Sequence, residues 1–150
     1  MNMAFLPISD VYACIHKTLR EDSVIRSLMG FDDTTTMVEM ASRIQKRMKP
    51  TNVTKNFPLI ALYKLPGQRE YSNHLAYVTA FDFDVYTNDD VELAVDIVDR
   101  INYLFDDKYL NLKKGSSFKG QYLTSAEDNT DMENTYKYFT QIEFTFGIEG

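Results

Sequence analysis

Two aspartates two positions apart, Asp82 and Asp84, have the residue type and spacing best suited to chemistry. On a strand this spacing points both carboxylates to one face, where they could hold a divalent cation. Mg²⁺ and Ca²⁺ sites usually need more converging oxygens on a defined loop. Asp89 and Asp90 follow, without an EF-hand glycine or a twelfth-position glutamate. We therefore expect no metal here, and a strand side that faces solvent or a partner.

Nucleophilic catalysis has few candidates in this chain. Cys14 is the one cysteine, and His16 and His74 are the two histidines. His16 is two positions from Cys14, so on a helix the two side chains point to different faces. The chain has no P-loop, no dinucleotide-binding fingerprint and no Gly-x-Ser-x-Gly motif. We expect a protein that is not an enzyme, with no catalytic residue, no metal and no cofactor.

Two clusters of opposite charge are the other candidates for function. They are Arg43, Lys46, Arg47 and Lys49, which are basic, and Glu127, Asp128 and Asp131, which are acidic. A solvated strand edge explains the basic cluster, because charge prevents edge-to-edge aggregation. A phosphate site is an alternative, although no glycine-rich loop accompanies the cluster. The third interpretation is that both clusters contact neighbouring subunits or line a channel.

Composition limits the classes of protein that fit. The chain has 150 residues, 44% of them hydrophobic, with a net charge of −6. This predicts one globular domain over 1–150. No apolar run is long enough for a membrane helix, and the first eight residues do not resemble a secretory signal, so folding in a cytoplasm is expected. The acidic balance argues against sequence-specific binding of DNA.

The first half of the chain predicts a broken helix followed by strands. The predicted elements are a helix over 9–29, broken near Glu21, and strands over 42–48 and 57–63. Ser9 is a suitable N-cap for the helix, and Gly30 is its expected C-terminal stop.

The second half contains the clearest periodicities. The predicted elements are a strand over 76–86, a helix from about 89 to 106, a turn over 113–117, a strand over 118–126, a polar loop over 127–134 and a strand over 136–148. Asp89 as N-cap and Glu92 have the spacing of a capping box. Together the elements predict an α+β fold, a mostly antiparallel sheet of about four to five strands with two helices packed on one face.

Several segments, in this order, resemble a known family. They are the Val11–Leu19 helical stripe with 22–30, the Arg43–Ile44 pair, the Pro-containing segment 57–62, the segment 81–86 with Asn88–Asp89 and the helix 91–105, and the final strand 139–146. The layout resembles the tail-terminator proteins of tailed bacteriophages, also called tail-completion or tail-to-head joining proteins.

The resemblance implies a structural virion protein located in the tail or neck and assembled in the host cytoplasm. Such proteins form a homohexameric ring at the head-proximal end of the tail tube, terminate tube growth and offer a surface for head–tail joining. The implied partners are further copies of the chain, the tail tube protein and the head–tail connector or stopper. DNA would pass through the lumen without specific binding, helped by acidic residues that repel phosphate.

A ring needs two different patches that meet between neighbours. The basic and acidic clusters are our candidates, and paired charge reversal at Arg47 and Asp128 would test them. Two alternatives stay open: another neck or head-completion adaptor, or a small metal- or nucleotide-binding enzyme that uses Asp82 and Asp84.

Overall fold

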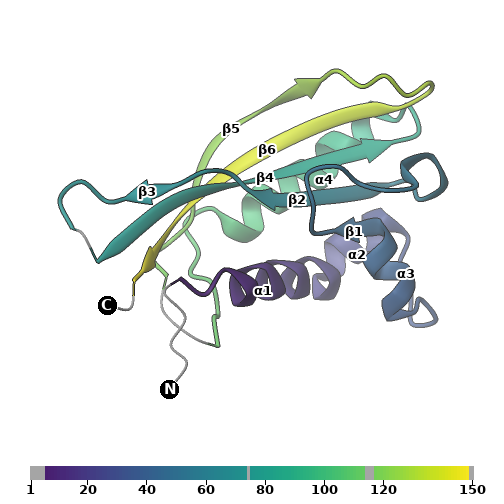
Figure 1. The fold of residues 1–150 in the computed structure, drawn as a ribbon. Helices are drawn as coiled ribbons and strands as arrows, with labels where there is room; N and C mark the ends of the chain where they lie inside the picture. The colour runs from purple at the N-terminus through teal and green to yellow at the C-terminus, as the bar shows by residue number, and fades with distance from the viewer. Residues whose placement is uncertain (1–5, 74, 114–116, 149–150) are drawn as a thin grey trace.

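The computed structural model describes residues 6–73, 75–113 and 117–148. Within these residues one mixed sheet has helices against one of its faces (Figure 1). The strands are β1 (Ile44–Gln45), β2 (Leu59–Lys64), β3 (Gln68–Arg69), β4 (Ala76–Thr87), β5 (Gln121–Asp128) and β6 (Tyr136–Gly147). The helices are α1 (Ile8–Glu21), α2 (Ser23–Met29), α3 (Met37–Arg43) and α4 (Val91–Phe105), with a short 3₁₀ turn η1 (Val53–Lys55).

The order of strands across the sheet is β1-β2-β4-β6-β5, and β3 pairs with β4. All pairings are antiparallel except that of β1 with β2, which is parallel. The predicted α+β fold with a mostly antiparallel sheet is confirmed. β1, of two residues, lies within the predicted strand 42–48, whereas β3, also of two residues, is a strand that the sequence analysis did not predict.

The main core lies between the sheet and the helices. Alternating residues of β4 and β6 point toward α1 and α4, as the period of two requires. The fully buried aromatic side chains of this core are Phe81, Phe83, Phe105, Phe144 and Phe146. Burying one such side chain stabilises the fold by roughly 1.5–3 kcal/mol. This burial accounts for the helices covering only this face.

The predicted N-caps of two helices are wrong, by two residues for α1 and by one for α4. α1 begins at Ile8 with Pro7 at the N-cap position, not Ser9, and proline is tolerated at the start of a helix because it has no N–H to leave unpaired. α4 is capped by Asp90, whose carboxylate accepts from the backbone N–H of Leu93 at 3.0 Å, so the capping box from Asp89 is not formed. Thr87 Oγ1 bonds both the N–H and the carbonyl of Asp90, and this turn delays the helix.

The helix 9–29 is broken as predicted. Asp22 ends α1 and caps α2, accepting from the N–H of Ile25 at 2.9 Å. Gly30, with φ of 76°, ends α2 as predicted, because glycine has no Cβ to oppose a left-handed conformation.

The predicted strand 42–48 is mostly wrong. The chain forms α3 up to Arg43, and only Ile44 and Gln45 are extended. Thr36 caps α3 by accepting from the N–H of Glu39 at 3.1 Å, so the local capping bond outweighs a weak alternation. Farther along, β5 runs to Asp128, and the predicted polar loop therefore starts two residues later than expected. Of the predicted turn over 113–117, residues 114–116 lie outside the described part.

The second face of the sheet has its own small cluster of buried side chains. Val53 of η1 and Met132 of the β5–β6 connection pack there with Leu59, Ala61 and Tyr86. Asp82 and Asp84 also lie on this face. No helix within the described ranges has the length and hydrophobicity needed to cross a membrane.

Candidate assembly surfaces

The two charged clusters lie at opposite edges of the sheet, and one transverse row joins Ile44 at the first edge to Glu127 at the second. The strand registers define this row as Ile44, Ile60, Val85, Tyr138 and Glu127. β1 is one edge and leads directly into Lys46 and Arg47, whereas β5 is the other edge and ends at Asp128. The clusters therefore do not meet within one chain. Along the strands they extend to opposite sides of this row, because β1 leads to Lys46 and Arg47 past the level of Ala126, whereas Asp128 and Asp131 lie beyond Glu127 in the other direction.

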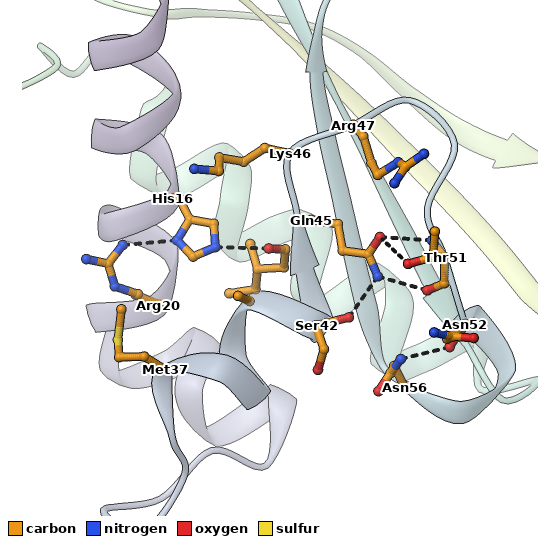
Figure 2. A pocket seen from close by; sticks show the side chains of 12 residues that line it. His16, Arg20, Met37, Ser42, Gln45, Lys46, Arg47, Thr51, Asn52 and Asn56 are labelled. Carbon is orange, nitrogen blue, oxygen red and sulfur yellow. Dashed lines mark hydrogen bonds between the residues drawn. The ribbon is translucent and has the colours of Figure 1, made fainter.

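A pocket of about 560 Å³ opens beside β1 (Figure 2). Its cationic side chains are Arg20, Lys46 and Arg47, and none of the described residues that line it is a carboxylate. We call it the basic pocket. Lys46 reaches toward α1, and Arg47 lies on the Thr51 side of β1. Lysine and arginine donors without an internal acid can bind a carboxylate or a phosphate.

His16 fixes one of these cations. Its Nε2 lies 2.9 Å from the carbonyl oxygen of Ile44, which can only accept, so Nε2 carries the proton. Nδ1 then accepts from the Arg20 guanidinium at 3.0 Å. Burial, followed by the charges of Arg20 and Lys46, lowers the pKa of His16, against the opposing hydrogen bond to Ile44. A neutral His16 therefore orients Arg20 at the wall of the basic pocket.

Gln45 closes the loop that carries the other two cations. Its Nε2 donates to the carbonyls of Ser42 at 2.8 Å and Thr51 at 2.9 Å, and its Oε1 accepts from the N–H of Thr51 at 2.9 Å. The side chain is 8% exposed. These partly buried hydrogen bonds join the two ends of the segment 46–50, which carries Lys46 and Arg47, while both cations stay exposed.

Arg43 belongs to the interior and not to the basic pocket. Its guanidinium donates to the carbonyls of Met29 and Pro58 and stacks over Phe31 at 4.9 Å from the ring centroid. Burial lowers its pKa. Lys49 is exposed but does not line the pocket. Of the four predicted basic residues, the structure brings Lys46 and Arg47 together with Arg20, which the sequence analysis did not select because it lies on α1.

The acidic residues are bound to different degrees. Asp128 pairs with Lys137 at 2.8 Å, and Glu127 accepts from the Tyr136 hydroxyl at 2.9 Å. Asp131 is exposed in the β5–β6 connection and makes no ion pair within the described part of the chain. Asp131 and Glu127 are thus the carboxylates best able to meet a second molecule.

Asp82 and Asp84 are buried within the chain, whereas the sequence predicted a strand side that faces solvent or a partner. Each is 3% exposed. Asp82 Oδ1 accepts from Gln141 at 3.1 Å, whereas its Oδ2 is buried without a hydrogen bond that meets strict geometric limits. Burial, then the hydrogen bond and charge of Asp82, raise the pKa of Asp84 to about 8. Side chains on both neighbouring strands cover the pair, because β4 is central in the sheet.

Lys137 lies 3.5 Å from Asp84 and 2.8 Å from Asp128. Burial alone would lower the pKa of Lys137, but the bond to Asp128 and the charge of Asp84 raise it. The nearer and more exposed Asp128 is its anionic partner, which is consistent with a protonated Asp84. In the described residues no third carboxylate, histidine or cysteine joins the pair in a group that could hold a metal.

Cys14 is not activated as a nucleophile. Its thiol points to the carbonyl of Asn111 at 3.6 Å, and burial raises its pKa. His16 is bonded to Ile44 and Arg20 instead, and His74 lies outside the described residues.

Comparisons with known proteins bear on the fold. No protein-family profile matches the sequence. No curated protein matches it either. Among solved structures, the chain is similar to one from the "Virion of native gene transfer agent (GTA) particle". The TM-score is 0.70 at 13% identity, over 96% of this chain and 99% of the other. The two chains therefore share a fold over nearly their whole lengths.

Proposed function

We propose that this chain is a structural protein of a phage-like virion. The observation that carries the proposal is the fold shared over nearly the full length with a chain of a gene transfer agent virion. The near-complete coverage of both chains also supports a single domain over 1–150. Such a protein assembles with other virion proteins and has no catalytic role.

Within the virion, we propose the role of tail terminator. A homohexameric ring of the chain would bind the head-proximal end of the tail tube in the neck, stop tube growth and offer a surface to the head–tail connector. The order of helices and strands and the resemblance of the sequence support this role. Exposed charges of opposite sign at opposite sheet edges suit a closed ring, which needs two different patches on each subunit.

The net charge of −6 suits a lumen through which DNA passes without binding. Assembly of the ring would take place in the host cytoplasm, before tails join heads.

Tube polymerisation with the tail tube protein of the same particle tests the terminator role. Tubes grown with the chain should be short and carry a ring at one end in electron micrographs, whereas tubes grown without it should be long and uncapped. Tubes of equal length in both cases would contradict the role.

Another neck or head-completion adaptor is the second candidate, since the shared fold alone supports any virion position. Deleting the gene distinguishes the two. Loss of a terminator should leave overlong tails unattached to heads, whereas loss of an adaptor should leave normal-length tails beside heads that lack a neck.

A further inference from the structure

We infer that copies of this chain associate edge to edge, with the basic pocket of one copy binding the acidic β5–β6 connection of the next. The acidic connection is the segment 127–133, which contains Glu127 and Asp131. The inference rests on the proposed ring and names the surfaces that would form it.

The strand registers align one end of the acidic connection with the wall of the basic pocket. Ile44, at the start of β1, and Glu127, near the end of β5, occupy the same transverse row of the sheet. A second copy placed beside the first, with its strands roughly parallel to those of the first, brings Glu127 level with Ile44 at the wall of the basic pocket. A shift of a few residues along the strands then brings the acidic connection to Lys46 and Arg47, which follow β1 on the side of the row away from Asp131, and a small rotation at each step closes a ring.

The width of the sheet keeps the two surfaces apart within one chain. Four strand spacings of about 4.8 Å separate β1 from β5, so the two edges are about 19 Å apart in one chain. A direct ion pair needs about 4 Å or less. The basic pocket and the acidic connection therefore cannot satisfy one another within a chain, and a pairing between them has to join two copies.

The cations of the basic pocket are held in place before any anion binds. Arg20 is held by a neutral His16, and Lys46 and Arg47 stand on a loop whose ends are fixed by Gln45. The cations are thus ordered in advance, which lowers the entropy lost on binding an anion. Asp131 offers a carboxylate that no described cation pairs with.

The edge strands allow this approach. Within the described residues β5 pairs only with β6, so its outer side from Thr124 to Asp128 has no partner strand. Its neighbour Gly120 is bridged to Asp106, which covers only the beginning of the edge. A second copy can therefore reach the acidic end of β5 without displacing another element.

Two residues of the original clusters are excluded from this contact. Arg43 is bound to backbone carbonyls inside the chain, and Asp128 is paired with Lys137. Reversing Asp128 would place two cations together in the same chain and disturb Lys137. Arg47 with Asp131 is therefore a cleaner pair for charge reversal than Arg47 with Asp128.

Zero-length cross-linking of the full chain tests the contact directly. A carbodiimide joins a lysine to a carboxylate only when the two are in contact. We expect a link from Lys46 to Glu127 or Asp131, found by peptide mass spectrometry between labelled and unlabelled chains in an isotope mixture. Links confined to other surfaces, or a chain that stays monomeric at its highest soluble concentration, would overturn the inference.

Charge reversal gives an independent test by sedimentation. Arg47→Glu and Asp131→Lys should each weaken self-association about tenfold or more, and the double variant should restore most of it. Lys108→Glu and Glu70→Lys reverse exposed charges elsewhere on the surface and should leave association unchanged. A double variant no better than the singles would overturn the contact. Thermal unfolding of each variant separates loss of association from loss of folding.

The failure of this inference and that of the proposed function are distinguishable. If wild-type protein caps tail tubes but the double variant is not rescued, the terminator role stands and the contact is wrong. If wild-type protein links Lys46 to Asp131 but never caps tubes, the contact stands and the terminator role is wrong.

Discussion

Asp22 accepts two hydrogen bonds from Arg100, which lies 78 positions later in the chain. Nε bonds Oδ2 at 2.9 Å and Nη2 bonds Oδ1 at 2.8 Å. The same carboxylate caps α2 through the N–H of Ile25. One side chain that is 10% exposed therefore both ends α1 and ties the α1–α2 junction to α4.

Replacing Asp22 should separate these two roles. Asp22→Ala is expected to lower the free energy of unfolding by about 1 kcal/mol for the lost cap alone, and by more through the lost contact with Arg100. Asp22→Asn keeps a good N-cap and loses the charge, so its loss should be smaller. Urea unfolding measures both, and equal losses would contradict the capping role.

The pH dependence of Asp22 has a definite sign. The hydrogen bond from Arg100 lowers the pKa of Asp22. The stability it contributes is therefore present above the ordinary aspartate pKa of about 3.9 and is lost as pH falls through the lowered value. The advantage of wild type over Asp22→Asn should be constant near neutral pH and vanish in acid.

Asp84 should show the opposite pH dependence. Its pKa is raised to about 8 in the folded chain, so the native state keeps a proton that the unfolded chain releases near pH 4. Its contribution to stability is complete below about pH 4 and falls until about pH 8, by up to about 1.4 kcal/mol per pH unit. Asp84→Asn keeps the shape and cannot ionise. The difference in unfolding free energy between wild type and Asp84→Asn should therefore decline as pH rises from 5 to 8. Parallel stability curves would show that Asp84 is already ionised at neutral pH.

Gln45 should control the loop that carries Lys46 and Arg47. Gln45→Ala leaves the N–H of Thr51 without its side-chain acceptor, at a cost of about 1 kcal/mol. We expect faster tryptic cleavage after Lys46 and Arg47, whereas the bond after Lys49 precedes Pro50 and resists trypsin. Asn56→Ala is the matched control, because Asn56 bonds only the nearby carbonyl of Asn52. Equal cleavage rates for the two variants would mean that Gln45 does not hold the loop.

Phe83 should be among the most costly residues to truncate. It is fully buried and stacks on Phe105 at 5.5 Å between centroids, where β4 meets α4. Phe83→Ala should lower the free energy of unfolding by about 3–5 kcal/mol. Phe118→Ala removes an aromatic ring that is 57% exposed and should have little effect. Denaturant unfolding that ranks the two alike would contradict the assigned core.

Long elements with strong periodicity were predictable from the sequence. β4 and β6 are twelve residues long and alternate apolar and polar side chains over 81–85 and 142–146, and α4 repeats apolar residues over fifteen. The break at Asp22 and the stop at Gly30 were also predictable, because an N-cap and a left-handed glycine act through bonds a few residues away.

Short elements were not predictable in the same way. α3 and β1 have seven and two residues, too few for a periodicity to show. The spacing of Thr36 and Glu39 is a capping signal that could have indicated α3. The parallel pairing of β1 with β2 depends on how α3 and the loop 46–56 pack. No local sequence pattern predicts that packing.

By itself, the sequence determined the two charge clusters, the lack of the catalytic motifs searched for and the order of the main helices and strands. These depend on residue types and on neighbours close along the chain. Only the tertiary structure decided that Arg43 is held inside while Arg47 stays exposed, that Arg20 joins Lys46, and that Asp84 is buried. Each of these outcomes depends on contacts between residues far apart in sequence. The balance of burial and hydrogen bonding at such contacts exists only once the sheet and helices are packed.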